Sequence, residues 1–318
     1  MSDYRACREA YTTTLLALAK EDPSIIVISS DARGSCSLNT FVETLPDQFV
    51  EIGIAEQNEI GVAAGLSVVG KKPFVCAPAC FLTTRSLEQV KVDVAYSHQN
   101  VKILGVSGGV SYGSLGASHH TLHDIAALRC IPDLAIILPC DAAQTEEVVR
   151  TIANQKGAFF VRIGREKIPQ IYTEELGIKP FILGKANTLR EGNDITLVSC
   201  GELVFHTLEA AKLLSKKGIE ARVLDMATLK PFDETAIIKA AKETKAIVTI
   251  EEHSINGGLG ATVSQIVCSN HPIPVKTLGF PDEYLVTGES RDLFAHYGLD
   301  AEGIAASAAT LTSHMRTG

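Results

Sequence analysis

The sequence contains no apolar run long enough to cross a membrane. The longest runs, such as Ile25–Ile28 and Leu134–Leu138, have the length of a strand, whereas a membrane-spanning helix needs about 20 apolar residues. The segment Met1–Ala10 mixes acidic and basic side chains and lacks the apolar centre of a signal peptide. We therefore expect no membrane partner and a cytoplasmic location.

The sequence also has fewer basic than acidic residues. The 29 Lys and Arg residues are outnumbered by 37 Asp and Glu residues, which leaves a formal net charge of −8. Because proteins that bind nucleic acids rely on clustered positive charge, this balance argues against a nucleic-acid partner. The 318 residues are 21% charged and 46% hydrophobic, which predicts two folded domains rather than a disordered chain.

The eight cysteines include no Cys-x-x-Cys pair, and several lie inside apolar, strand-like runs. This pattern is typical of reduced thiols packed in a core. Cys76 and Cys80 have a spacing that suits metal ligands, but no second pair of cysteines or histidines completes a zinc site. We predict that this chain alone provides no metal site.

Short β-branched runs alternate with longer stretches of helical periodicity in the first half of the chain. This alternation is typical of βαβ units around a mainly parallel sheet. The expected strands are Ile25–Ile28, Pro73–Ala77, Val101–Val106, Leu134–Leu138 and Phe159–Ile163, and the expected helices are Arg5–Lys20, Glu56–Val69, Leu82–His98, His120–Arg129 and Ala142–Gln155.

The pattern lapses after Ile163 and then resumes. The second set of expected strands is Ile195–Ser199, Ala221–Leu224, Ala246–Ile250 and Val275–Leu278, and the expected helices are Leu203–Lys217, Asp233–Lys242, Leu259–Cys268 and Glu302–His314. The sequence therefore predicts two α/β domains of about equal strand count, residues 1–165 and 185–318. Residues 166–184 are predicted to form the linker.

Familiar nucleotide-binding motifs are missing. No G-x-x-x-x-G-K-[ST] motif occurs, and the glycine-rich stretch Asn256–Gly260 has Val263 where the third glycine of G-x-G-x-x-G would fall. This stretch fits a tight loop that opens a helix better than it fits a dinucleotide site.

Two segments contain candidate catalytic residues. Glu56 lies between apolar residues and a helix rich in small residues, so it is expected to be buried with a raised pKa, unless it only complements a helix N-terminus. The glycine-rich segment 107–124 follows a strand and contains His119, His120 and His123. It is expected to form a loop at the carboxyl end of the sheet, where imidazoles contact a substrate.

Several separated motifs resemble the transketolase family. Gly53–Asn58 followed by Gly61–Gly65 is similar to the family's pyrimidine-domain motif, and Phe81-Leu82, Gly116–His119 and Ile163–Arg165 follow in the family's order. The second block, from Gly184 through Glu251-Glu252-His253 and Gly257–Gly260, resembles the transketolase C-terminal domain. The resemblance covers nearly the whole chain. It implies a thiamine-diphosphate pyrimidine-binding domain, followed by a transketolase C-terminal-like α/β domain.

One family motif is absent. Transketolases hold the diphosphate and its Mg²⁺ with a G-D-G motif on a separate domain, and no G-D-G occurs here. The chain thus resembles the C-terminal subunit of a split transketolase. The resemblance implies a separate N-terminal subunit that holds the metal and the diphosphate, two copies of each chain in the assembly, and sugar phosphates as substrates.

The resemblance also implies roles for individual residues. Glu56 would hydrogen-bond the cofactor's pyrimidine and support its imino tautomer, Phe81 would stack on the pyrimidine, and Asp31 would lie near the cofactor. His119 would contact the sugar near its reacting carbon. Further substrate contacts are expected from the phosphate-type residues Arg5, Ser35 and Arg165, and from Ser107 and His120.

The sequence departs from the family in segment 107–124. Many transketolases have a histidine in place of Ser107 and an acidic pair in place of Ser114 and Leu115. Because those groups contact the donor sugar, we expect a donor that differs from the common pentose and hexose phosphates.

Two other functions remain open from sequence alone. The beta subunit of a 2-oxo acid dehydrogenase shares this architecture and an equivalent glutamate. The Ile54–Asn58 motif and the phosphate-type residues Arg5, Ser35 and Arg165 favour transketolase. A non-catalytic or regulatory subunit could keep the fold, although the presence of Glu56 and Phe81 argues against it.

Overall fold

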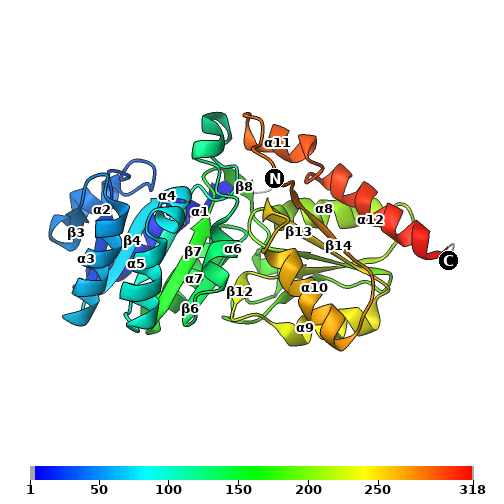
Figure 1. Ribbon diagram of the computed structural model, residues 1–318, viewed down its shortest axis with the longest axis horizontal. Helices are drawn as coiled ribbons and strands as arrows, with labels where there is room; N and C mark the ends of the chain where they lie inside the picture. Colours follow the sequence, from blue (N-terminus) through cyan, green and yellow to red (C-terminus); the bar gives the residue numbers. More distant parts are fainter. Residues whose placement is uncertain (1–3, 317–318) are drawn as a thin grey trace.

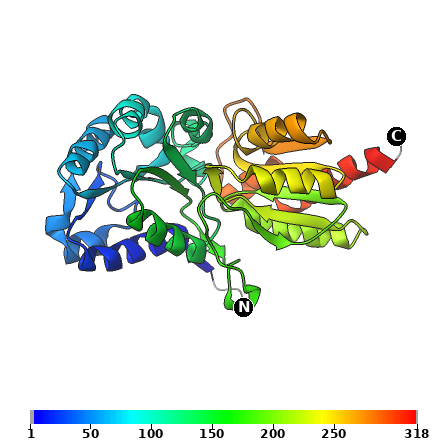
Figure 2. The same ribbon diagram turned by 90° about the horizontal axis from the view of Figure 1, so that it is seen from below.

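The computed structural model describes residues 4–316 and contains two α/β domains that lie side by side (Figure 1). The ends of the two predicted domains, residues 1–3 and 317–318, lie outside the described residues. Seen from below, both sheets are covered by helices on their two faces (Figure 2). Within the described residues, no helix combines the length and apolarity needed to cross a bilayer.

The first domain is built on a mainly parallel sheet that has seven strands among the described residues. Their order is β12-β6-β7-β5-β4-β2-β3. The strands are β2 (Ile25–Ser29), β3 (Phe49–Glu51), β4 (Lys72–Pro78), β5 (Lys102–Val106), β6 (Leu134–Ile137), β7 (Ala158–Ile163) and β12 (Thr228–Lys230). All neighbours pair in parallel except β12 and β6. The central strands are mostly apolar and buried along nearly their whole length because helices cover both of their faces, and the predicted strands are confirmed.

Helices connect these strands as the periodicity predicts, with two exceptions. The elements are α1 (Cys7–Glu21), α2 (Asn39–Thr44), η1 (Pro46–Gln48), α3 (Glu56–Val68), α4 (Ala79–Thr84), α5 (Leu87–Gln89), the π-helix η2 (Val90–Tyr96), the 3₁₀ segment η3 (Gly113–Ser118), α6 (Asp124–Arg129) and α7 (Ala142–Asn154).

The predicted helix Leu82–His98 is wrong as a continuous element. It is divided into α4, α5 and η2, because Ser86 leaves the helical backbone region at φ −108°, ψ 20° and its hydroxyl donates to the Leu82 carbonyl. The predicted helix from His120 begins only at Asp124. Residues 120–123 instead belong to a loop that is closed by a bridge between Gly109 and Thr121.

The second domain has a five-stranded sheet within residues 4–316, in the order β14-β13-β10-β11-β9. The strands are β9 (Asn187–Arg190), β10 (Ile195–Ser199), β11 (Ala221–Asp225), β13 (Ile247–Ser254) and β14 (Val275–Phe280), and the helices are α8 (Leu203–Ser215), α9 (Glu234–Glu243), α10 (Leu259–Asn270), α11 (Ser290–His296) and α12 (Ala301–Arg316). β13 runs four residues beyond the predicted end at Ile250, because Glu251–Ser254 are buried in the continuing strand.

The two domains share part of a hydrophobic core and one sheet in addition to the linker. The hydrophobic core of the first domain continues into residues of the second, including Val198, Leu224 and Ile247. β12, from the second half of the sequence, completes the first sheet, so the expected equality of strand number does not hold. In segment 166–184, β8 (Lys167–Pro169) pairs with β1 (Tyr4–Ala6), and η4 (Glu174–Leu176) follows. We propose residues 1–165 and 185–318 as the limits of the two domains.

Candidate active site

Glu56 is the first residue of α3 and is buried, with 5% of its surface exposed. The small and apolar residues that predicted its burial pack α3 against β4, and Ile60, Ala63 and Ala64 lie in the core. Its carboxylate Oε1 accepts a hydrogen bond from Arg85 Nη1 at 2.8 Å, and the Arg85 guanidinium lies 3.9 Å from the centre of the Phe81 ring. A buried carboxylate and an aromatic ring thus share one cation.

A pocket of about 210 Å³ brings together most of the predicted site residues at the carboxyl ends of β2 and β4. Among the residues that line it are Asp31, Ser35, Glu56, Phe81 and His119. Loops at the carboxyl ends of parallel strands are where α/β proteins bind ligands. Five residues from four separate segments of the sequence therefore face one cavity.

Asp31 is fixed in this pocket by its backbone. It has a positive φ of 54°, and its N–H donates to the Glu51 carboxylate at 2.7 Å. The same Glu51 oxygen accepts the Gly53 N–H at 2.9 Å. The two segments that lead into the pocket are thereby tied together, and the Asp31 side chain remains exposed.

His119 lies among aromatic rings at the pocket wall. Its ring is edge-on to Phe81 at 5.3 Å and to Tyr112 at 5.4 Å between centroids, and its Nδ1 is 2.9 Å from Ser118 Oγ. These contacts orient the imidazole over the cavity that Glu56 also lines.

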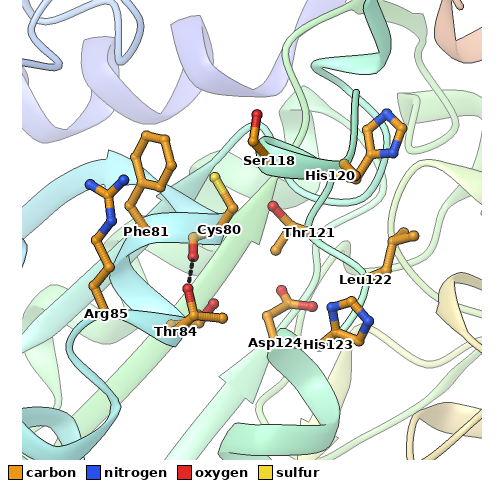
Figure 3. Close-up of a pocket in the computed structure, with 12 residues that line it drawn as sticks. Cys80, Phe81, Thr84, Arg85, Ser118, His120, Thr121, Leu122, His123 and Asp124 are labelled. Carbon is orange, nitrogen blue, oxygen red and sulfur yellow. Dashed lines mark hydrogen bonds between the residues drawn. The ribbon is translucent and has the colours of Figure 1, made fainter. Parts of the chain in front are cut away.

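His120 and Ser107 occupy different places. His120 lines a neighbouring pocket of about 210 Å³, where it lies across from Phe81 and Arg85 (Figure 3). Its Nε2 is 3.2 Å from the Gly113 carbonyl, and burial lowers its pKa. Ser107 is fully buried at a positive φ of 62°, and it does not belong to the wall of either pocket. The structure therefore does not place Ser107 at the surface of either cavity.

Ser35 and Arg165 meet at Tyr112, but Arg5 does not join them. The Tyr112 hydroxyl donates to Ser35 Oγ at 2.8 Å, and the Arg165 guanidinium lies 4.1 Å from the Tyr112 ring centre. Arg5 instead pairs with Glu146 of α7 at 2.5 Å. Of the three predicted phosphate contacts, only Ser35 and Arg165 are brought together.

Arg8, the second residue of α1, lies beside Ser35 instead. Its Nη1 donates to the Ser35 carbonyl at 3.2 Å. Burial raises the pKa of the nearby Cys36 thiol, and the Arg165 and Arg8 guanidinium groups oppose that rise. Within the described part of the chain, Arg8 Nε and Arg165 Nη1 are buried donors without a hydrogen-bond partner. Two cations with free N–H groups beside a serine suit an anion.

Sequence reasoning missed Arg8 and Arg85. Arg8 lies in the first turn of α1 and Arg85 follows the last residue of α4, and nothing in their spacing distinguishes them from surface charges. Only the packing of α1 against the Ser35 turn, and of Arg85 over Phe81, reveals their positions.

The donor set fits the pyrimidine end of thiamine diphosphate. A buried carboxylate, a neighbouring aromatic ring and a cavity between them suit a planar nitrogen heterocycle. Among residues 4–316, no group of three or more His, Cys, Asp and Glu side chains is arranged to hold a metal ion.

Fold and site together define an α/β protein with a pyrimidine-binding first domain. The chain belongs to the transketolase family: residues 3–170 match its pyrimidine binding domain and residues 184–304 match its C-terminal domain. The family depends on thiamine diphosphate. The chain corresponds over nearly its whole length to the C-terminal subunit of split transketolases.

Three relatives illustrate this correspondence. The chain is 55% identical to a subunit of the apulose-4-phosphate transketolase of Phocaeicola vulgatus, covering 95% of this chain and 96% of the relative. It is 35% identical to a 6-deoxy-6-sulfo-D-fructose transketolase subunit of a Clostridium species, covering 96% and 94%. A solved structure described as a split gene transketolase, inactive beta4 tetramer, is 39% identical and superposes with a TM-score of 0.87 over 97% of this chain and 98% of that one.

Proposed function

We propose that this chain is the pyrimidine-side subunit of a two-chain transketolase that moves a two-carbon ketol unit from a ketose phosphate to an aldose phosphate. The observation that carries the proposal is the convergence of Glu56, Phe81 and His119 on one cavity. Thiamine diphosphate supplies the carbanion chemistry when it is bound. Membership of the transketolase family disfavours the 2-oxo acid dehydrogenase and regulatory alternatives.

The site residues of this chain would have different roles in the reaction. The Glu56 carboxyl group, one oxygen of which accepts from Arg85, would share a proton with the pyrimidine, and Phe81 would pack against the same heterocycle. His119, oriented by Phe81 and Tyr112, would contact the sugar hydroxyls. Arg8, Ser35 and Arg165 would bind the phosphate, because Arg8 bonds the Ser35 carbonyl and Tyr112 bonds the Ser35 hydroxyl and packs against Arg165, which gathers two guanidinium groups around one hydroxyl.

The diphosphate and Mg²⁺ are assigned to a partner subunit. The chain has no G-D-G motif, and we propose an assembly of two copies of this chain with two of an N-terminal transketolase subunit. The homotetramer of the solved relative is described as inactive, which supports a requirement for the partner.

For the donor we propose apulose 4-phosphate, the sugar named for the 55% identical relative. In this chain the apolar side chain of Leu115 lines the pocket and is 51% exposed, where many transketolases have an acid. An apolar wall gives no acceptor for a hydroxyl of a common donor, so it favours a sugar of different shape.

The test of this donor is kcat/KM in the reconstituted enzyme, measured with apulose 4-phosphate and with xylulose 5-phosphate. We expect apulose 4-phosphate to be favoured by at least about tenfold, which corresponds to about 1.4 kcal/mol of transition-state preference. A tenfold preference for xylulose 5-phosphate would overturn the donor assignment while leaving the transketolase activity in place.

A further inference from the structure

The loop that holds Tyr112 and His119 has a closed base. Gly109 and Thr121 form a β-bridge, in which the Thr121 N–H donates to the Gly109 carbonyl at 2.7 Å, and the Gly108 N–H donates to the Ile163 carbonyl at 3.0 Å. We call residues 107–124 the donor loop. Tyr112 lies three residues after Gly109 and His119 lies two residues before Thr121. Contacts that fix the base of the loop therefore also restrain these two side chains.

The second domain reaches into this base through Glu252 of β13. The Glu252 Oε1 atom accepts the Val110 N–H at 2.8 Å in a buried setting. Gly109 has a positive φ of 58°, and a Cβ at that position would lie 2.0 Å from the Glu252 carboxyl carbon. The glycine therefore leaves the space that the carboxylate fills, and backbone and side chain interlock.

Arg162 links the other end of the donor loop to the same carboxylate. Its Nη1 is 3.2 Å from Asp124 Oδ1, its Nη2 donates to the Glu252 carbonyl at 2.9 Å, and it lies 3.9 Å from Glu252 Oε2. All three side chains are buried. One guanidinium thus joins the end of the loop to the strand of the second domain that holds its beginning.

Further contacts join the second domain to both sides of the loop. The Ser290 hydroxyl donates to the Val110 carbonyl at 3.0 Å, and the Gly288 N–H donates to the Gly113 carbonyl at 3.3 Å. The Ser254 N–H donates to the Leu122 carbonyl at 3.1 Å. Val110 and Leu122 belong to the hydrophobic core of the second domain rather than to that of the first. In Figure 1, α11 lies beside the turn that precedes α6.

We infer that the second domain is a brace that positions the donor loop, with Glu252 and Ser290 as positioning residues for Tyr112 and His119. Neither residue lines the pocket that contains Glu56. They act by fixing the backbone of Val110, two residues before Tyr112. This inference rests on the proposed function for its effect on catalysis, but the brace itself is a property of the chain alone.

Amide hydrogen exchange on the isolated full-length chain tests the brace without any turnover. In Ser290→Ala and Glu252→Ala, peptides that cover 108–122 should exchange at least about tenfold faster, because a hydrogen bond to the loop backbone is lost. Peptides from β2 and β4 should be unchanged. Ser307→Ala on α12, in the same domain, is the matched control and should leave the loop unchanged. Unchanged exchange of the loop in both variants would overturn the brace.

Kinetics of the reconstituted enzyme test whether positioning of the donor loop affects binding of the donor sugar. Ser290→Ala should raise the KM for the donor by roughly 2- to 10-fold, as expected for one lost hydrogen bond, with the affinity for thiamine diphosphate unchanged. Ser290→Thr, which keeps the hydroxyl, should restore the wild-type value. Glu252→Gln, which keeps an acceptor for Val110, should have a smaller effect than Glu252→Ala. Normal donor KM in a loosened loop would refute positioning, whereas absence of turnover in the wild-type assembly would refute the proposed function instead.

Discussion

At the scale of single residues, the site depends on how burial and pairing fix a few polar groups. Glu56 is nearly inaccessible, yet its carboxylate is paired with Arg85, which is half-exposed. The ion pair with Arg85 orients the carboxylate, so an entirely apolar environment is not needed to hold it in place. The proton function that we assign to Glu56 therefore depends on its carboxyl oxygens rather than on its size.

Glu56→Gln tests that function. The amide keeps the shape of the side chain but cannot share a proton with the pyrimidine, so turnover of the reconstituted enzyme should fall by about 10²- to 10⁴-fold. Assembly, followed by light scattering, should be unchanged. Glu302→Gln on the second domain is the control. Activity near that of the wild type would assign Glu56 to stabilisation of the α3 N-terminus alone.

The arginines provide a matched pair of variants. Arg8→Ala should raise the KM for a phosphorylated sugar far more than for the unphosphorylated sugar, since a charge-assisted contact contributes about 1.5 to 3 kcal/mol. Arg5→Ala should not discriminate between the two sugars, because Arg5 pairs with Glu146 on α7. The same discrimination by Arg5→Ala, with none by Arg8→Ala, would restore the assignment made from the sequence.

At the scale of elements, α3 contains a second buried acid. Glu59 is fully buried, and among the described residues neither carboxyl oxygen has a partner in good hydrogen-bond geometry, although the Ser30 hydroxyl and the Cys76 backbone oppose part of the effect of burial on its pKa. Burial raises the pKa of Glu59 to about 8. The folded chain therefore holds a proton on Glu59 that the unfolded chain releases above its ordinary pKa of 4.5. Folding stability contributed by this site must decrease as the pH rises from about 5 to about 8.

Glu59→Gln should remove this dependence. We expect the free energy of unfolding of the wild type to fall relative to the variant by up to about 1.4 kcal/mol per pH unit within that window. Urea unfolding at pH 5.5, 7 and 8.5, at one chain concentration, measures the difference. Because other buried acids titrate in both proteins, the comparison isolates Glu59. Parallel pH profiles for the two proteins would show that Glu59 is ionised in the fold.

The strands and most helices could be predicted because apolar periodicity determines them locally. The division of Leu82–His98 could not, since it depends on a hydroxyl of Ser86 that bonds back to the preceding turn. The extension of β13 was missed because Glu251–His253 look like loop residues until the start of α10 pairs with Glu251 and the first domain pairs with Glu252 and His253. Short elements such as β12 have no period and form only by pairing with a distant strand.

The site residues that lie in recognisable sequence motifs could be predicted. Glu56, Phe81, Asp31, Ser35 and His119 do line one cavity. The contact of Arg8 with Ser35 could not be predicted, because it depends on which side of α1 faces the Ser35 turn.

At the scale of the whole molecule, the chain provides half of the active site that we propose. The first domain presents groups for the pyrimidine and the sugar, the second domain holds the donor loop in place, and the diphosphate end is assigned to another chain. The most direct measurement is the rate of ketol transfer from apulose 4-phosphate to an aldose phosphate, with thiamine diphosphate and Mg²⁺ present. It is measured for this chain alone, for an N-terminal transketolase subunit alone and for their mixture. We predict turnover only in the mixture, saturating at equal amounts of the two chains. Turnover by this chain alone, or none from this or any other ketose phosphate in the mixture, would contradict the division of the site between two chains.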